Sequence, residues 1–317
     1  MTEPSTERAP RPRLGPLGVW AEPESMSASE VRAYVRRIGE LGYDCFWVAE
    51  TVGREPFTLL GALSETAGER LSLGTSIASI YGRDAVTTRG AAMTVHELTG
   101  GHFVTGLGVS HPHLVHKVRG HEFTRPVSTM RDYLAAYHAA PYRGPRLDVG
   151  DPPVLIAALR ERMTELAATD ADGAFPYLFS PERVRWMREL LDRVAAPKVE
   201  AGAEPPLLAV TLPVVLESDA ETARATARIY LKPYLRTPTY QQSWALQGFT
   251  EEDWEKPGSD ALVDAMVAWG DRATLLARIR EMAEAGADHV ALIPLSPEGV
   301  TEHLPTVEAL GPAGESA

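Results

Sequence analysis

The segment Phe103–His111 constrains the fold of this chain more than any other. It reads Phe-Val-Thr-Gly-Leu-Gly-Val-Ser-His and directly follows the sequence His-Glu-Leu-Thr-Gly-Gly-His at 96–102. The short apolar run predicts a buried strand, and its glycines would let a planar ligand approach the backbone closely. A histidine just past the end of a parallel strand lies where α/β barrels place their chemistry. The segment therefore predicts a parallel α/β fold with His111 at the edge of a site.

The rest of the chain alternates strand and helix. Ser27 and Glu30 have the spacing of a capping box, and Ser180 precedes a proline at a first helical position. Such start signals separate eight short apolar segments that we expect to be strands, at 17–20, 43–49, 71–77, 103–108, 154–157, 172–175, 207–215 and 288–293. Eight strands with helices between them favour a closed (β/α)8 TIM barrel of the α/β class. An additional helical insertion is expected at about 237–270, after the seventh strand.

Length and charge narrow the range of functions. The 317 residues suit one barrel-sized domain, expected at 14–317, and residues 1–13 are expected to form a disordered arm. No apolar run reaches the ~18 residues that span a bilayer, and the start of the chain has no apolar signal core. We therefore expect a cytoplasmic protein without a membrane partner. The net charge of −12 argues against general nucleic-acid binding and leaves a small-molecule substrate as the expected partner.

The single cysteine, Cys45, excludes an intrachain disulfide and a multi-cysteine metal site. It belongs to the apolar run Cys-Phe-Trp-Val, which predicts a buried and unreactive thiol.

Polar side chains follow several of the expected strands. The carboxyl ends of barrel strands meet at one mouth, so we expect these side chains to converge there. His111 can exchange a proton near neutral pH, and partial burial of Glu50 would raise its pKa. Either residue could act as acid or base, and the spacing does not decide between them. The alternative for each residue is a solvated position at the rim. The candidates are Glu50, Ser76, Ile77, Ser79, Gly108, Ser110, His111, Arg160 and Arg162.

The pair His111 and His113 is also compatible with a zinc hydrolase, because a His-x-His pair at a strand end can bind zinc. The pair follows the fourth strand here, whereas barrel hydrolases place it on the first. The expected eighth strand ends without an aspartate, and the fifth and sixth end without a histidine. We therefore predict no metal site and expect His113, His116 and His121 to lie in a polar loop over the mouth.

Taken together, these segments resemble the luciferase-like monooxygenase superfamily, and within it the actinobacterial oxidoreductases that use the deazaflavin coenzyme F420. The resemblance spans roughly residues 14–310 and is specific for the superfamily but less so for the cofactor. It rests on the segments 41–50, 73–80, 97–111, 119–127, 171–174 and 286–288.

The resemblance implies a barrel whose mouth holds a flavin or deazaflavin ring across the strand ends. It implies a non-proline cis peptide near Ser76-Ile77 that backs the ring, with Ser79 and Gly108 beside it. It also implies that His111 acts as the acid or base, with Glu50 orienting His111 or the substrate. Ser110, Arg160 and Arg162 would face the cofactor phosphate.

Two departures from the pattern matter. Thr51 stands where relatives often have histidine, and Arg160-Glu161 stands where they have Gly-Pro in the turn that receives the phosphate. Arg160 could pair with the phosphate, or it could block the pocket while Glu161 repels the anion.

The primary hypothesis is hydride transfer between coenzyme F420 and a small organic substrate. One alternative is an FMN-dependent two-component monooxygenase, and another is a degenerate, non-catalytic or cofactor-independent barrel. Relatives often dimerise, so a homodimer is an expectation that the residues themselves do not fix.

Overall fold

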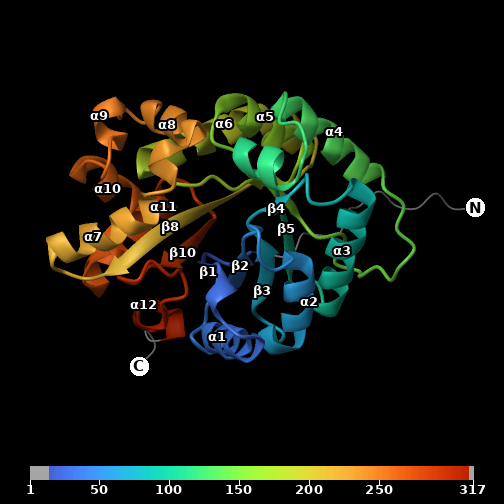
Figure 1. The fold of residues 1–317 in the computed structure, drawn as a ribbon. Helices are drawn as coiled ribbons and strands as arrows, with labels where there is room; N and C mark the ends of the chain where they lie inside the picture. The colour runs from blue at the N-terminus through green and yellow to red at the C-terminus, as the bar shows by residue number, and fades with distance from the viewer. Residues whose placement is uncertain (1–13, 314–317) are drawn as a thin grey trace, which may run out of the picture.

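A computed structural model describes residues 14–313, so the expected arm at 1–13 lies outside the described residues. Parallel strands form the centre of the molecule and helices surround them (Figure 1). The last barrel strand pairs with both the first and the seventh, which closes the sheet, and the predicted TIM barrel is thereby confirmed. The eight barrel strands are β1 (Leu17–Ala21), β2 (Cys45–Val48), β3 (Ser72–Thr75), β5 (Phe103–Gly108), β6 (Val154–Ile156), β7 (Gly173–Ala174), β8 (Leu207–Leu216) and β10 (His289–Pro294).

Two further short strands were not predicted. β4 (Ala78–Ser79) continues the direction of β3 and pairs with β5 at Leu107 and Gly108. β9 (Ala268–Gly270) pairs with the carboxyl end of β8, which overlaps the part of β8 that pairs with β10 only at Val214. Both extend the sheet at the carboxyl ends of barrel strands, so they help to shape the mouth.

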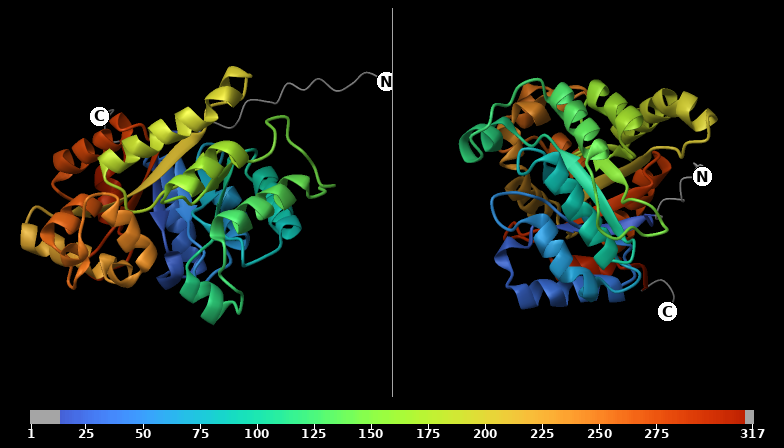
Figure 2. Two further views of the ribbon diagram at one scale, coloured as in Figure 1. Left: turned by 90° about the horizontal axis from the view of Figure 1, so that it is seen from above. Right: turned by 90° about the vertical axis from the view of Figure 1, so that its right-hand side faces the viewer.

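The helices form an outer layer around the strands (Figure 2). Ser27 and Glu30 form the predicted capping box of α1, and Ser180 accepts a hydrogen bond from the backbone N–H of Arg183 at the start of α6. The helices of this layer are α1 (Ala28–Glu40), α2 (Pro56–Ala67), α3 (Ala85–Leu98), α4 (Pro126–Ala139), α5 (Glu161–Asp170), α6 (Pro181–Glu200), α7 (Ala220–Leu231), α11 (Arg272–Glu284) and α12 (Leu304–Leu310).

The predicted helical insertion after the seventh strand is also present. It comprises α8 (Pro238–Ala245), α9 (Glu251–Trp254) and α10 (Asp260–Met266), followed by β9. The 3-10 helix η3 (Tyr234–Arg236) leads into it, and η1 (Pro23–Ser25) follows β1. The inner face of α8 is buried through Tyr240, Ser243 and Trp244. The insertion is thus packed onto the barrel rather than projecting from it.

Large side chains fill the barrel interior, and small ones make room for them. The indole N–H of Trp47 donates to Nε2 of the buried His289 at 2.8 Å. A Cβ on Gly74 would lie 2.3 Å from the Trp47 ring, and one on Gly18 would lie 2.6 Å from His289. These glycines are therefore required by packing, because interiors are close-packed. Cys45 is fully buried and burial raises the pKa of its thiol, which confirms the predicted burial.

Candidate functional site at the barrel mouth

The non-proline cis peptide expected near Ser76-Ile77 is present at that bond. It lies between β3 and β4, at the mouth. The indole N–H of Trp20, near the end of β1, donates to the carbonyl oxygen of Ser76 at 3.0 Å, so the first and third barrel strands are joined here. Ser76 and Ile77 are both half-buried, so they line the mouth rather than the core.

The glycines of β5 serve strand packing. A Cβ on Gly106 would lie 1.9 Å from the carbonyl oxygen of Thr75, and the Thr75 hydroxyl both donates to and accepts from the Gly106 backbone. A Cβ on Gly108 would lie 2.4 Å from Cδ1 of Ile77. Neighbouring protein atoms thus occupy the position that a Cβ would take at both glycines. The predicted place of Gly108 beside a cofactor ring stays a prediction.

His111 lies just beyond β5, where the sequence predicted it. Ser110 before it has a left-handed φ of 57°, which costs a non-glycine residue of order 1 kcal/mol and persists at sites where the surroundings enforce it. Burial lowers the pKa of His111, so its ring is neutral at pH 7. Its Nδ1 is buried and has no hydrogen-bond partner among residues 14–313. A neutral ring with an unused nitrogen can bind or exchange a proton with a ligand.

Tyr240 of the insertion covers His111. The two ring centroids are 5.4 Å apart, and the Tyr240 hydroxyl is 3.5 Å from Nε2 of His111, at the long limit of a hydrogen bond. Tyr240 also contacts Tyr177 and Tyr234, and the Tyr177 hydroxyl is hydrogen-bonded to those of Tyr230 and Tyr234. Burial raises the pKa of each of these phenols. Sequence analysis missed this cluster, because Tyr177 follows β7 whereas Tyr230 of α7, Tyr234 of η3 and Tyr240 of α8 lie 53 or more positions later in the chain.

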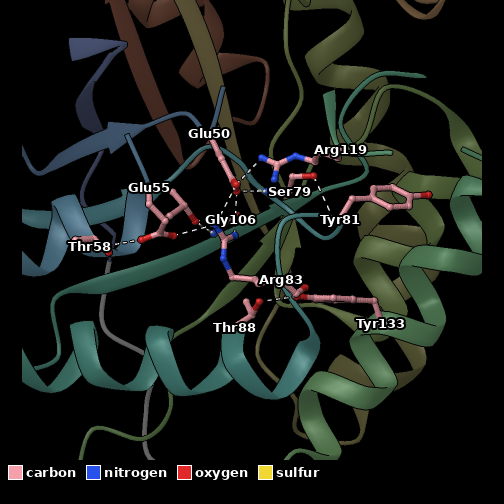
Figure 3. Close-up of polar contacts among 11 residues, drawn as sticks. Glu50, Glu55, Thr58, Ser79, Tyr81, Arg83, Thr88, Gly106, Arg119 and Tyr133 are labelled. Atoms are coloured by element: carbon pink, nitrogen blue, oxygen red, sulfur yellow. Dashed lines mark hydrogen bonds and ion pairs between the residues drawn. The ribbon is translucent and has the colours of Figure 1, made fainter. Parts of the chain in front are cut away.

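Glu50 lies at the end of β2 and both of its carboxylate oxygens are engaged (Figure 3). Oε2 accepts from the backbone N–H of Ser79 at 2.8 Å and from Arg83 at 2.9 Å. Oε1 accepts from Arg83 at 3.0 Å and from Arg119 at 2.6 Å. The side chain is only 6 % exposed, so this is a buried carboxylate held by two cations.

Through this network Glu50 can position the segment that follows β5. Arg83 precedes α3 and also pairs with Glu55, whereas Arg119 follows the π-helical segment η2 (Leu114–Val118) that begins three residues after His111. Glu50 thus joins the end of β2 to the segment that follows β5. None of the described contacts of its carboxylate is with His111, so any influence of Glu50 on that ring passes through Arg119 and the intervening segment.

Glu22 is a carboxyl at the mouth that sequence analysis missed. It follows β1 directly, and burial together with the nearby Glu24 and Glu302 raises its pKa. Its position after an apolar strand is the same signal that identified Glu50, so the sequence could have indicated it. A carboxyl with a raised pKa at a barrel mouth is a candidate proton donor.

The residues expected to face a cofactor phosphate lie around the amino end of α5, starting with Arg160. Arg160 is the N-cap residue of α5, and its guanidinium donates to Oε1 of Gln242 on α8 at 2.6 Å. Arg162 is exposed on the first turn of α5. Arg183, which sequence analysis missed, donates to the carbonyl oxygen of Leu159 just before this turn. Three arginines therefore lie at or near the amino end of α5, which favours anions through its free N–H groups and dipole.

The residues present fit a flavin or deazaflavin in two respects. The buried, unpartnered Nδ1 of His111 offers a polar contact at the strand ends, and the arginines around α5 offer cations for a phosphate. Among residues 14–313, no group of three or more His, Cys, Asp and Glu side chains is arranged to hold a metal ion. His113, His116 and His121 are exposed in the segment after β5, as expected.

Comparison with known proteins identifies the family. The family model described as luciferase-like monooxygenase matches residues 13–289. The chain belongs to this family. It is 28% identical over 249 residues to a Mycobacterium tuberculosis protein named provisionally as a coenzyme F420-dependent oxidoreductase, covering 69% of this chain and 70% of the relative. The resemblance inferred from the sequence segments is thereby confirmed.

Solved structures with the same fold include members that use different cofactors. The coenzyme F420-dependent tetrahydromethanopterin reductase from Methanopyrus kandleri has a TM-score of 0.72 at 15% identity, covering 94% of this chain and 98% of its own. A Baeyer–Villiger monooxygenase component from Pseudomonas putida in complex with FMN has a TM-score of 0.68 at 13% identity, covering 95% and 98%. At these identities the likeness establishes the fold alone. No helix within residues 14–313 is both long and apolar enough to cross a membrane.

Proposed function

We propose that this member of the luciferase-like family is an oxidoreductase that binds coenzyme F420 and transfers a hydride to or from a small organic substrate. The observation that carries the proposal is His111: a neutral, half-buried imidazole just past β5, whose buried Nδ1 has no hydrogen-bond partner among residues 14–313. Membership of the family and the name of the mycobacterial relative support the choice of cofactor. The cofactor, when bound, supplies the ring carbon that gives or accepts the hydride, and the protein supplies orientation and proton transfer.

In this proposal His111 holds or accepts the proton of the substrate oxygen at a ring nitrogen. Its lowered pKa keeps the ring unprotonated at pH 7, which suits a base for alcohol oxidation. Glu50 positions the segment that carries His111 by holding Arg119. Tyr240, which is buried and lies against the His111 ring, shields that side of the ring from water.

Ser76, Ile77, Ser79 and Gly108 are proposed to surround the cofactor ring, and Ser110, Arg160 and Arg162 to face its phosphate side. Of these, the Ser79 N–H is already bonded to Glu50 and Gly108 already contacts Ile77. Their proposed role is therefore to form the wall behind the ring rather than to donate hydrogen bonds to it. The homodimer and the cytoplasmic location also remain predictions.

The FMN-dependent two-component monooxygenase is the second candidate, favoured by the structural neighbour in complex with FMN. Deazaflavins react poorly with oxygen, so the two candidates differ in oxygen consumption as well as in ligand.

The test is a fluorescence titration of the purified protein with coenzyme F420 and, in parallel, with FMN. Saturable micromolar or tighter binding of F420 alone is the expected result. A preference for FMN would replace the proposal with the monooxygenase. Binding of neither would leave the third alternative, a barrel that does not use a flavin.

A further inference from the structure

The amino end of α5 is an uncapped helix start next to buried positive charge. Arg160 is its N-cap residue and makes no side-chain capping bond, so the first backbone N–H groups of this ten-residue helix have no side-chain acceptor. Most other long helices of the described chain begin with a capping side chain, such as Asp84 at α3 and Asp219 at α7. An acceptor from outside the helix would satisfy the free donors of α5.

Arg183 is a second and independent feature of this site, the amino end of α5 with its neighbouring arginines, which we call the α5 corner. Its side chain lies 3.4 Å above the ring of Trp186, and the residue is only 7 % exposed. One guanidinium nitrogen donates to the carbonyl oxygen of Leu159, while Nε has no hydrogen-bond partner within the described chain. Burial lowers the pKa of Arg183 to about 10, so the guanidinium still carries its charge at neutral pH. A buried, charged and incompletely paired side chain beside a helix start favours an anionic ligand.

Glu161 does not cancel this preference. It lies on the first turn of α5, and its charge raises the pKa of Arg183 against the effect of burial. The two opposite charges therefore interact. Arg160 and Arg162 remain beside them, so the corner keeps a net positive charge.

Gln242 is hydrogen-bonded to the guanidinium of Arg160, the group that an anion bound at this helix start would also contact. Its Oε1 accepts from Arg160 at 2.6 Å, and both residues are exposed. The Gln242 side chain can rotate away without moving α8, because α8 is held by its buried inner face, with Tyr240 and Trp244. An amide oxygen is a weaker acceptor for a guanidinium than a phosphate oxygen, which carries charge.

We propose that Gln242 competes with the cofactor phosphate for Arg160, and that it thereby lowers the affinity of this protein for phosphate-bearing ligands relative to phosphate-free ones. The inference rests on the proposed function, since it assigns the phosphate of the same cofactor to this corner. It makes Gln242 a specificity-determining residue on the insertion.

The experiment compares ligands that differ in the phosphate. FMN is paired with riboflavin, and coenzyme F420 with the same deazaflavin lacking its phosphate-bearing tail. Dissociation constants are measured for wild type, Gln242→Ala, Arg160→Ala and the double variant. Gln242→Ala is expected to tighten binding of the phosphate-bearing ligands about five-fold, the worth of one ordinary hydrogen bond, and to leave the phosphate-free ligands unchanged. Arg160→Ala is expected to weaken the phosphate-bearing ligands at least about ten-fold.

The double variant and a matched control decide the mechanism. If Gln242 acts through Arg160, removing it in the Arg160→Ala background has no further effect. Gln241→Ala is the control, because Gln241 lies on the same helix but donates to the carbonyl oxygen of Leu235 instead. An unchanged or weakened affinity in Gln242→Ala, or a gain shared by riboflavin or kept without Arg160, overturns the proposal.

Failure of the proposed function is recognised separately. If no flavin or deazaflavin binds any variant, the oxidoreductase proposal falls, and inorganic phosphate then tests the corner alone. Phosphate is titrated while the Arg160 Nε–H signal is followed by NMR. Tighter phosphate binding in Gln242→Ala supports the competition, and an Arg160 signal that phosphate does not shift in either protein overturns it.

Discussion

The hydroxyl of Tyr240 lies 3.5 Å from Nε2 of His111, so a residue of the insertion covers the imidazole at the end of β5. The other ring nitrogen of His111 is buried and unpartnered in the described chain. The insertion therefore completes the surroundings of His111, and its packing keeps that ring neutral through burial. This relationship connects the most variable kind of barrel segment, a loop insertion, to the group proposed for proton transfer.

Replacing His111 is expected to separate chemistry from binding. His111→Ala should reduce kcat by about 100-fold or more, the usual contribution of a general acid or base, while the dissociation constant of the cofactor changes little. The measurement is steady-state turnover together with fluorescence titration of the same preparations. Unchanged turnover would remove His111 from the proton-transfer role.

The pH dependence of turnover follows from the burial of His111. Its pKa lies below the ordinary 6.5, so kcat for alcohol oxidation should be level at pH 7 and fall only at more acidic pH, as the ring becomes protonated. Tyr240→Phe keeps the packing but removes the hydroxyl, and Tyr240→Ala opens the ring to water. The acidic limb should move towards 6.5 in Tyr240→Ala more than in Tyr240→Phe, and equal profiles in all three proteins would contradict this reading.

Glu50 is predicted to matter for stability as well as for activity. Glu50→Gln removes the charge that pairs Arg83 and Arg119, which are 10 % and 22 % exposed. Breaking a buried ion pair in this way should lower the free energy of unfolding by about 3 kcal/mol, because Arg119 loses its carboxylate partner and Arg83 keeps only Glu55. Urea denaturation measures the effect. Glu308→Gln, which breaks the exposed pair with Arg37, is the control and should leave the urea midpoint unchanged.

His289 makes stability depend on pH. Both of its ring nitrogens are used in the neutral form, one accepting from Trp47 and the other donating to the carbonyl of Gly15, and burial lowers its pKa to about 4. Between pH 6.5 and pH 4 the unfolded chain binds a proton that the folded chain does not, so stability falls as the pH falls. The loss attributable to this residue should reach about 3 kcal/mol.

Thermal or urea unfolding of wild type and His289→Gln across this range tests the prediction. The variant should be less stable at pH 7 and should lose less stability on acidification. If both proteins lose stability in parallel, His289 is not the cause.

Two glycine substitutions should have opposite effects. Gly106→Ala would place a Cβ 1.9 Å from the Thr75 backbone oxygen, which cannot be relieved by rotating a side chain, so we expect severe destabilisation. Gly90→Ala lies within α3 and meets no atom within 4 Å, so it should stabilise the protein by about 0.5–1 kcal/mol through helix propensity. Melting temperatures of the two variants provide the comparison, and a tolerated Gly106→Ala would show that β3 and β5 are not locked together here.

The sequence by itself determined the order of elements and the barrel. Strand and helix periodicity are local properties, and caps such as Ser27 and Asp271 mark helix starts by side-chain chemistry within three residues. The same locality put His111 and Glu50 at strand ends, since parallel strands carry their carboxyl ends to one mouth. The sequence resemblance also indicated the family and the position of the Ser76-Ile77 bond.

Only the tertiary structure decided what these residues contact. Glu50 meets Arg119 across 69 positions of the chain, Tyr240 meets His111 across 129, and Arg160 meets Gln242 across 82. No local pattern encodes such pairings, because they depend on how loops of different lengths fold over the mouth. The structure also decided that Gly106 and Gly108 accommodate neighbouring protein atoms, for the close packing of adjacent strands is set by both strands together.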